Sequence, residues 1–235
     1  MKSNLFDKSL WINSYILIII IHLYACFYHF ENIRIYTKVL LMPFLLKIYI
    51  NSTTEENRSK FVSIGLLLGF FGDTFLIFSE HSLLFLIYGL ICFLSGHLCY
   101  IIEMIKRIKT KNFIKNFWIF FLLIIFISFN IIWQYTYYLK DGLIRGKMII
   151  PGFLYMLILG SLNLFSLFYM ICYFEKRKLL LVLGTLLFWI SDFTLARDLF
   201  YESNIYYPFI IMSTYISAQT LITYGLCNKD DFIII

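Results

Sequence analysis

Two carboxylates stand inside otherwise apolar segments of this chain. Asp73 lies in "LLLGFFGDTFLIF" and Asp192 in "GTLLFWISDFTLA". An acid at the centre of a bilayer costs about 2.5–3.5 kcal/mol on insertion scales, so such residues are functional candidates by default. Two neighbouring carboxyls do not ionise together, and one can then donate a proton while the other stays anionic. The pair indicates general acid–base chemistry, and the sequence does not tell which residue is the acid.

A histidine and four polar uncharged residues occupy similar segments. His97 precedes Tyr100 by three residues, and Tyr215 precedes Gln219 by four, so each pair shares one face of a helix. Ser191 directly precedes the second acid. We expect His97 to position water or to shuttle a proton. We expect the other four to orient the acids or the head group of a ligand.

One base also stands within an apolar stretch. Lys38 is the second residue of the run "TKVLLMPFLL", and Pro43 lies five residues further on, where it is expected to kink a helix. The lysine has two interpretations. Its ammonium group could extend to the membrane interface, as long basic side chains do, or it could contact the phosphate of a bound ligand.

The composition sets the class of protein that must position these residues. The chain has 235 residues, of which 61% are hydrophobic and 14% charged, and its mean hydropathy is +0.81. Apolar runs of about 18 or more residues recur, which is typical of multi-pass membrane proteins. The runs lack the alternation of a membrane barrel, so helices are expected. The net charge of +6 resides in short connections and does not indicate nucleic acid binding. The five cysteines form no CxxC pair and read as buried apolar residues.

The apolar runs predict an all-α membrane protein with eight transmembrane helices in one domain, residues 1–235. The predicted spans are 10–29, 33–50, 61–79, 83–105, 115–138, 148–173, 179–198 and 205–227. Both acids follow a glycine by eight residues, in "GLLLGFFGD" and "GTLLFWISD". This similarity suggests two parallel four-helix repeats. A rise of about 1.5 Å per residue, counted from the side on which both spans begin, places the two acids at nearly equal depth, about 18–20 Å from that side.

The basic residues predict the orientation. Fourteen of the twenty Lys and Arg residues lie near the termini, the end of the second span and the connections 2–3, 4–5 and 6–7. The other six lie on the opposite side. Basic connections stay in the cytoplasm, so we expect both termini there. The protein is expected in the plasma membrane of a prokaryote or the endoplasmic reticulum of a eukaryote.

These motifs together resemble the lysoplasmalogenase (YhhN-like) family of multi-pass membrane proteins. The resemblance rests on "TKVLLMPFLL", "LLLGFFGDTFLIF", "GLICFLSGHLCYI", "GTLLFWISDFTLA" and "YISAQTLITYG", which extend over nearly the whole chain. It implies an eight-helix fold and a lysophospholipid substrate in the bilayer. It also implies hydrolysis of a vinyl ether bond, which releases a fatty aldehyde and glycerophospho-ethanolamine or -choline. We expect Asp73 and Asp192 to be the acid–base pair, with no metal and no other cofactor.

Two alternatives remain open. A non-enzymatic lipid-binding protein or a proton-coupled transporter would use the same acids at the centre of the membrane. A metal-dependent hydrolase of the ceramidase type would need several converging histidines, and His97 is the one that lies deep in a predicted span.

Overall fold

The computed structural model describes residues 2–141 and 148–227, and this part of the chain consists of helices and short connections. Arg145, Lys147 and Lys229, which entered the count of basic residues, lie outside the described residues. Contacts divide the chain into two compact units. Of the described residues, the first unit holds 2–99 together with Leu226 and Cys227, and the second unit holds 100–141 and 148–225.

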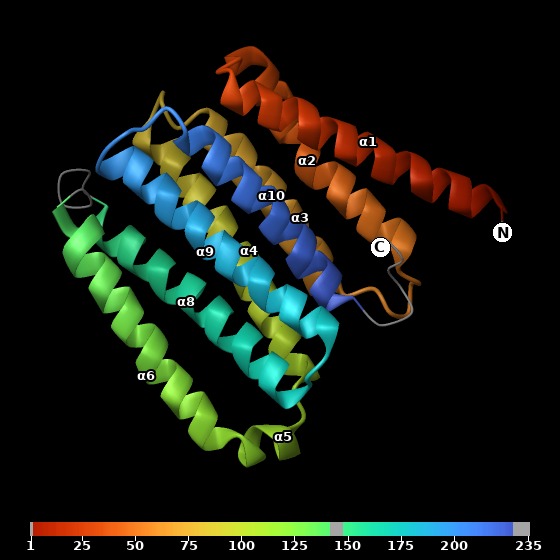
Figure 1. Cartoon of the computed structure of the whole chain (residues 1–235), viewed down its shortest axis with the longest axis vertical. Coiled ribbons are helices and arrows are strands. Elements are labelled where there is room, and N and C mark those ends of the chain that lie inside the picture. Colours follow the sequence, from red (N-terminus) through yellow and green to blue (C-terminus); the bar gives the residue numbers. More distant parts are fainter. Residues whose placement is uncertain (1, 142–147, 228–235) are drawn as a thin grey trace. The chain divides into compact units, whose positions relative to one another are not determined.

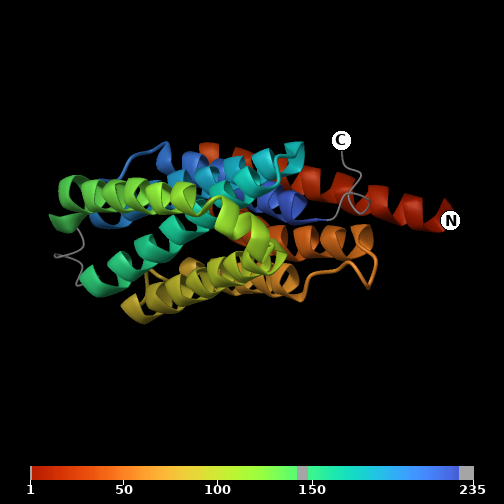
Figure 2. The same cartoon turned by 90° about the horizontal axis from the view of Figure 1, so that it is seen from below.

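The first unit is built from three helices and the start of a fourth. These are α1 (Lys2–Phe27), α2 (Glu31–Ser52), α3 (Lys60–Ile77) and the first part of α4 (Leu83–Arg107). α1 and α2 run side by side (Figures 1 and 2), and α2 also contacts α3. α3 begins at a capping serine, because the Ser59 side chain accepts a hydrogen bond from the backbone N–H of Val62.

A tight turn joins α1 to α2. His29 has a φ of 59°, in the left-handed region that few residues other than glycine adopt. The backbone N–H of Phe30 donates to the carbonyl of Ala25 at 2.9 Å, which closes α1 with a Schellman-type bond. The chain reverses within three residues. Positions at nearly equal distances from the turn, such as His22 and Thr37, are therefore neighbours.

The second unit continues from the last part of α4. Its further elements are α5 (Thr110–Lys115), α6 (Phe117–Gln134), the π-helix η1 (Tyr135–Leu139), α8 (Ile149–Cys172), α9 (Lys176–Phe200) and α10 (Tyr207–Leu226). α8 lies between α6 and α9 (Figure 1). Ile127, Ile131 and Leu164 form the buried centre of the contact between α6 and α8. A Cβ atom added to Gly160 would lie 2.5 Å from Cδ1 of Ile131, so glycine permits this approach.

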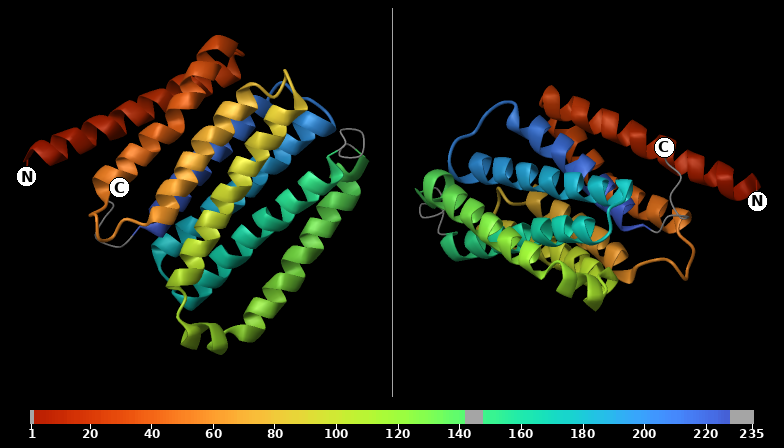
Figure 3. Two further views of the ribbon diagram at one scale, coloured as in Figure 1. Left: turned by 180° about the vertical axis from the view of Figure 1, so that it is seen from behind. Right: turned by 60° about the horizontal axis from the view of Figure 1, so that its bottom comes forward.

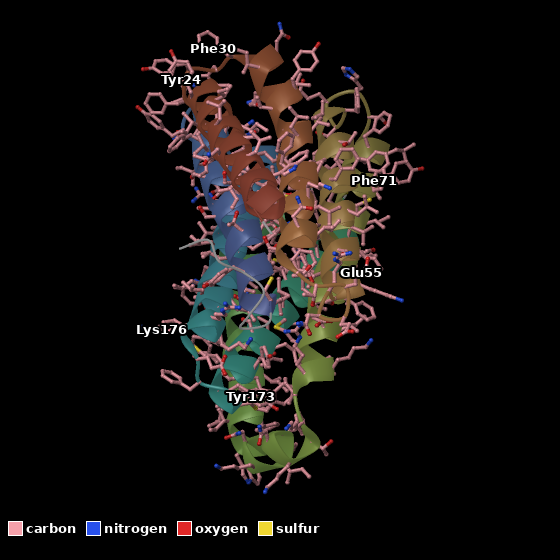
Figure 4. The ribbon with its side chains drawn as sticks, turned by 90° about the vertical axis from the view of Figure 1, so that its right-hand side faces the viewer. Tyr24, Phe30, Glu55, Phe71, Tyr173 and Lys176 are labelled. Atoms are coloured by element: carbon pink, nitrogen blue, oxygen red, sulfur yellow. The ribbon has the colours of Figure 1, made fainter. Side chains whose placement is uncertain are left out.

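Large apolar side chains remain on the outside of both units. Tyr24 of α1, Phe30 of the turn before α2 and Phe71 of α3 point outward in Figure 4, and Trp118 in α6 is 75% exposed. Such an amount of exposed apolar surface would be unfavourable in water, whereas lipid chains are as apolar as the side chains themselves. The exposed side chains therefore support the membrane class expected from composition.

Seven helices of the described part are long and apolar enough to cross a membrane. They are α3, α4, α8, α9, α10, the Ser9–Phe27 part of α1, and α6 with its continuation to Tyr137. α2 is helical over the expected range, but Glu31, Arg34, Lys38 and Lys47 make it more polar than the others. The fold class is thus confirmed as an all-helical membrane protein. The count of eight, the single domain, the repeats and the cytoplasmic termini stay predictions.

Candidate functional site

Asp73 lies on the buried face of α3. The buried positions in this helix recur every three or four residues and include Gly65, Gly69 and Gly72 immediately before the acid. Asp73 itself is 2% exposed. In contrast, Phe71 on the opposite face is 42% exposed and points outward (Figure 4). The helical period therefore directs the acid into the first unit and the phenylalanine out of it.

Lys38 of α2 meets this acid. Its Nζ lies 3.6 Å from Oδ1 of Asp73, and the two side chains are 18% and 3% exposed. In a medium where neither charge is well solvated each compensates the other, so removal of one partner would leave an uncompensated buried charge. In the structure Lys38 makes a contact that neither sequence interpretation named, and contact with a ligand phosphate stays a prediction. The lysine turns inward, and its ammonium group contacts a carboxylate.

α4 packs closely against α3 beside the acid (Figure 3). A Cβ atom on Gly72 would lie 2.8 Å from Cε2 of Phe93, and one on Gly96 would lie 3.3 Å from the carbonyl oxygen of Gly65. Small residues let two membrane helices approach in this way. His97 follows Gly96 and is buried in α4. The first unit thus contains Asp73, Lys38 and His97 as buried or nearly buried polar residues.

Asp192 in the second unit has a different partner. The phenol of Tyr155 in α8 donates a hydrogen bond of 2.6 Å to Oδ2 of Asp192 in α9. One turn earlier in α9, the indole N–H of Trp189 donates to Oε1 of Gln134 at 2.8 Å. These two bonds tie α9 to α8 and to the end of α6. A phenol beside a carboxyl group fixes its orientation and can exchange a proton with it.

The remaining predicted residues of the second unit join α9 or α4 to α10. Ser191 donates to the backbone carbonyl of Ile211 at 3.1 Å. Tyr215 packs edge-on against Phe188, with ring centroids 5.5 Å apart. Tyr100 and Gln219 are also in contact, because the phenol of Tyr100 donates a hydrogen bond of 2.9 Å to Oε1 of the Gln219 amide. All four side chains are buried.

The structure therefore brings two pairs of predicted site residues into contact, Asp73 with Lys38 and Tyr100 with Gln219, although the sequence did not predict these pairings. Asp73 belongs to the first unit and Asp192 to the second, so their pairing stays a prediction from the sequence. Sequence reasoning missed Tyr155. It is one of 18 tyrosines, lies in an apolar run, and carries no local signal that would distinguish it.

No group of three His, Cys, Asp or Glu side chains suited to a metal ion occurs among the residues that the structure describes. In a comparison with known protein families, the sequence model of the YhhN family matches residues 33–226. The match begins within α2 and ends at the last residue of α10, so it includes every candidate residue described above. Neither the curated proteins nor the solved structures yielded a match to this chain.

Proposed function

Because this chain belongs to the YhhN family, which includes lysoplasmalogenases, we propose that it is a membrane lipid hydrolase that cleaves the vinyl ether bond of a lysoplasmalogen. The observation that supports this proposal is the pair of intramembrane acids with unlike partners. Asp73 lies beside an ammonium group, and Asp192 beside a phenol. Unlike surroundings are what separates an acid from a base in enzymes that use two carboxyls.

The proposed reaction begins with transfer of a proton to the vinyl carbon that does not carry oxygen. The double bond shifts, and an oxocarbenium ion forms at the carbon that does. Water adds to that carbon and loses a proton to a base, which gives a hemiacetal. The hemiacetal hydroxyl then loses its proton, the bond to the glycerol oxygen breaks, and that oxygen takes up a proton. The products are a fatty aldehyde and glycerophospho-ethanolamine or -choline. One water is consumed and the proton is regenerated.

The two acids fit the two needs of this reaction. We assign the anionic role to Asp73, because the ammonium group of Lys38 stabilises its negative charge and the anion would stabilise the developing cation. We assign the proton donor role to Asp192, because the phenol of Tyr155 holds its carboxyl group in one orientation. Two carboxyls divide their work similarly in glycosidases, where the transition state also resembles an oxocarbenium ion. His97 is proposed to position the water.

The direct test incubates purified protein with a lysoplasmalogen and with the corresponding 1-acyl ester, and measures free aldehyde and free fatty acid. The proposal expects aldehyde from the vinyl ether and no cleavage of the ester, since the ester cannot be protonated at carbon in the same way. In D₂O, the aldehyde trapped by rapid reduction should carry one deuterium on the carbon next to the former carbonyl. Aldehyde without that deuterium would contradict protonation at carbon.

Two variants test the residues. Asp73→Asn and Asp192→Asn should each lower the rate of aldehyde release by at least about 100-fold, the usual contribution of general acid–base catalysis. Matched controls are Glu80→Gln, an exposed acid just after α3, and Asp198→Asn near the end of α9, whose carboxylate accepts a hydrogen bond from Ser203. Both controls should retain activity. Full activity in both aspartate variants would end the assignment.

The alternative of a lipid-binding protein or proton-coupled transporter is separated by the same substrate in sealed liposomes. A hydrolase consumes the lipid and produces aldehyde, whereas a transporter redistributes intact lipid between the leaflets. Redistribution without aldehyde, lost in the two aspartate variants, would favour transport.

A further inference from the structure

α1 lies wholly before the segment that the family model matches, yet it contacts the helix that carries Lys38. We propose that His22 of α1 is a positioning residue, which acts through Thr37 to hold Lys38 against Asp73. The inference rests on the proposed function insofar as Asp73 is catalytic. The contact between Lys38 and Asp73 is a feature of the structure itself.

The first step is a chain of hydrogen bonds between α1 and α2. Nδ1 of His22 lies 2.7 Å from Oγ1 of Thr37, and Nε2 lies 3.6 Å from the sulfur of Cys26. The Thr37 hydroxyl donates to the carbonyl of Ile33 at 2.6 Å. A hydroxyl has one proton, so Oγ1 accepts from the N–H at Nδ1 of His22. Nε2 then accepts from the thiol, and every member of the chain has a defined direction.

The side chains of this hydrogen-bond chain are buried. His22 and Cys26 are fully buried, and Thr37 nearly so. A polar group in this environment is expensive unless it is hydrogen-bonded, so the bond between His22 and Thr37 is strongly preferred over alternative arrangements. The tight turn at His29 brings His22 and Thr37 side by side. Helix and turn account for all the residues between them, so no flexible segment separates the two. The pair therefore fixes which face of α2 is turned toward α1.

The helical geometry of α2 links the direction of Thr37 to that of Lys38. Thr37 and Lys38 are consecutive, so their side chains leave the helix about 100° apart. One contacts α1 and the other contacts α3. Fixing the rotation of α2 at Thr37 consequently fixes the direction of Lys38. Pro43 increases this dependence, because it cannot donate to the carbonyl four residues earlier and weakens the helix just after Lys38.

A separate contact holds α1 and α2 together elsewhere. The rings of Trp11 and Phe44 lie 5.3 Å apart, and Nζ of Lys47 lies 5.7 Å from the Trp11 ring. Loss of the His22 bond should therefore leave the two helices associated. Loss of this hydrogen bond should change only the rotation of α2 about its axis and the direction of the Lys38 side chain.

The experiment uses substitutions that keep or remove one ring nitrogen. His22→Asn places an amide where Nδ1 lies and should retain the bond to Thr37, whereas His22→Gln reaches the Nε2 position and His22→Leu removes both. We expect turnover of lysoplasmalogen to fall roughly tenfold in the Gln and Leu variants, as for a modest misplacement of a reacting group. The Michaelis constant should change little, and the Asn variant should be close to wild type. His81→Leu, in an exposed connection, is the control.

A second measurement does not depend on activity. Thermal unfolding in detergent of Lys38→Met, Asp73→Asn and the double variant gives the coupling between Lys38 and Asp73. We expect this coupling in the wild-type background, its loss with His22→Leu, and its retention with His22→Asn. Full coupling in the His22→Leu background would overturn the proposal. If the wild-type protein releases no aldehyde, the proposed function fails, while this cycle still decides the role of His22.

Discussion

The α3–α4 helix pair of the first unit and the α9–α10 helix pair of the second unit both pack closely at a glycine. In each, the glycine eight residues before the acid meets the following helix. The carbonyl of Gly65 lies 3.3 Å from the Cβ position of Gly96, and the Cβ position of Gly184 lies 2.9 Å from the backbone nitrogen of Ile222. The sequence pattern common to the two acidic segments, a glycine eight residues before the acid, thus corresponds to the same kind of close helix packing.

The two regions differ in what they supply to the acid. The partner of Asp73 is an ammonium group from α2, whereas the partner of Asp192 is a phenol from α8. Neither partner belongs to the glycine-packed pair. Two similar helix pairs can therefore place an acid beside an ammonium group or beside a phenol. The partner is supplied by a third helix, which is α2 in the first unit and α8 in the second. The following variants test this comparison, starting with the largest expected effect.

Lys38→Met should be the most damaging single change. It leaves Asp73 as a buried charge without its cation, and breaking a buried ion pair costs about 3–5 kcal/mol. The free energy of unfolding in detergent measures this loss. The double variant Lys38→Met/Asp73→Leu should recover much of the stability but no hydrolysis, and the exposed Lys60→Met should be neutral. A loss below about 1 kcal/mol in Lys38→Met would show that the pair is not a buried charge pair.

Glycine substitutions should separate the two helix pairs. In Gly184→Ala the new methyl group meets the backbone of Ile222 at 2.9 Å, so α10 must move, and we expect a cost of about 3 kcal/mol. In Gly72→Ala it meets the side chain of Phe93 at 2.8 Å, which can rotate, and we expect about 1 kcal/mol. Combining Gly72→Ala with Phe93→Leu should restore stability. Equal costs for the two single variants, measured by unfolding, would remove the distinction.

Tyr155→Phe tests the phenol beside Asp192. Removal of one hydrogen bond to a carboxyl group should cost about 1.5 kcal/mol of stability. It should also reduce the rate of aldehyde release more than the Michaelis constant changes, because the substrate would still bind. Tyr206→Phe, at an exposed site before α10, serves as the control. Unchanged turnover in Tyr155→Phe would remove Tyr155 from the proposed mechanism.

Ser191→Ala should have the smallest effect. Its hydroxyl donates to the carbonyl of Ile211, and such bonds between membrane helices average about 0.6 kcal/mol. Thr194→Ala, which loses a bond to the carbonyl of Ile190 within its own helix, should have an effect close to zero. Activity should be retained in both. A large loss of activity with unchanged stability in Ser191→Ala would instead place the hydroxyl in the reaction.

Most elements were predictable, whereas several details of the fold were not. The expected spans coincide with helices to within a few residues, apart from the longer start of α1. The short α5 and the π-helix η1 carry no clear apolar pattern, and both lie in or beside a connection. Two charged residues within α2, Lys38 and Lys47, reduced its apolar character, although their contacts are made inside the first unit.

The sequence by itself determined the helices and the two intramembrane acids, because a backbone in lipid must satisfy its hydrogen bonds within its own segment. Only the tertiary structure decided that Asp73 meets Lys38, that Asp192 meets Tyr155 and that His22 meets Thr37. The reason is physical. A side chain's partner depends on the rotation and depth of each helix, and these are set by close packing at glycines and by the α1–α2 turn, which involve residues far apart in the chain or without a distinctive local pattern.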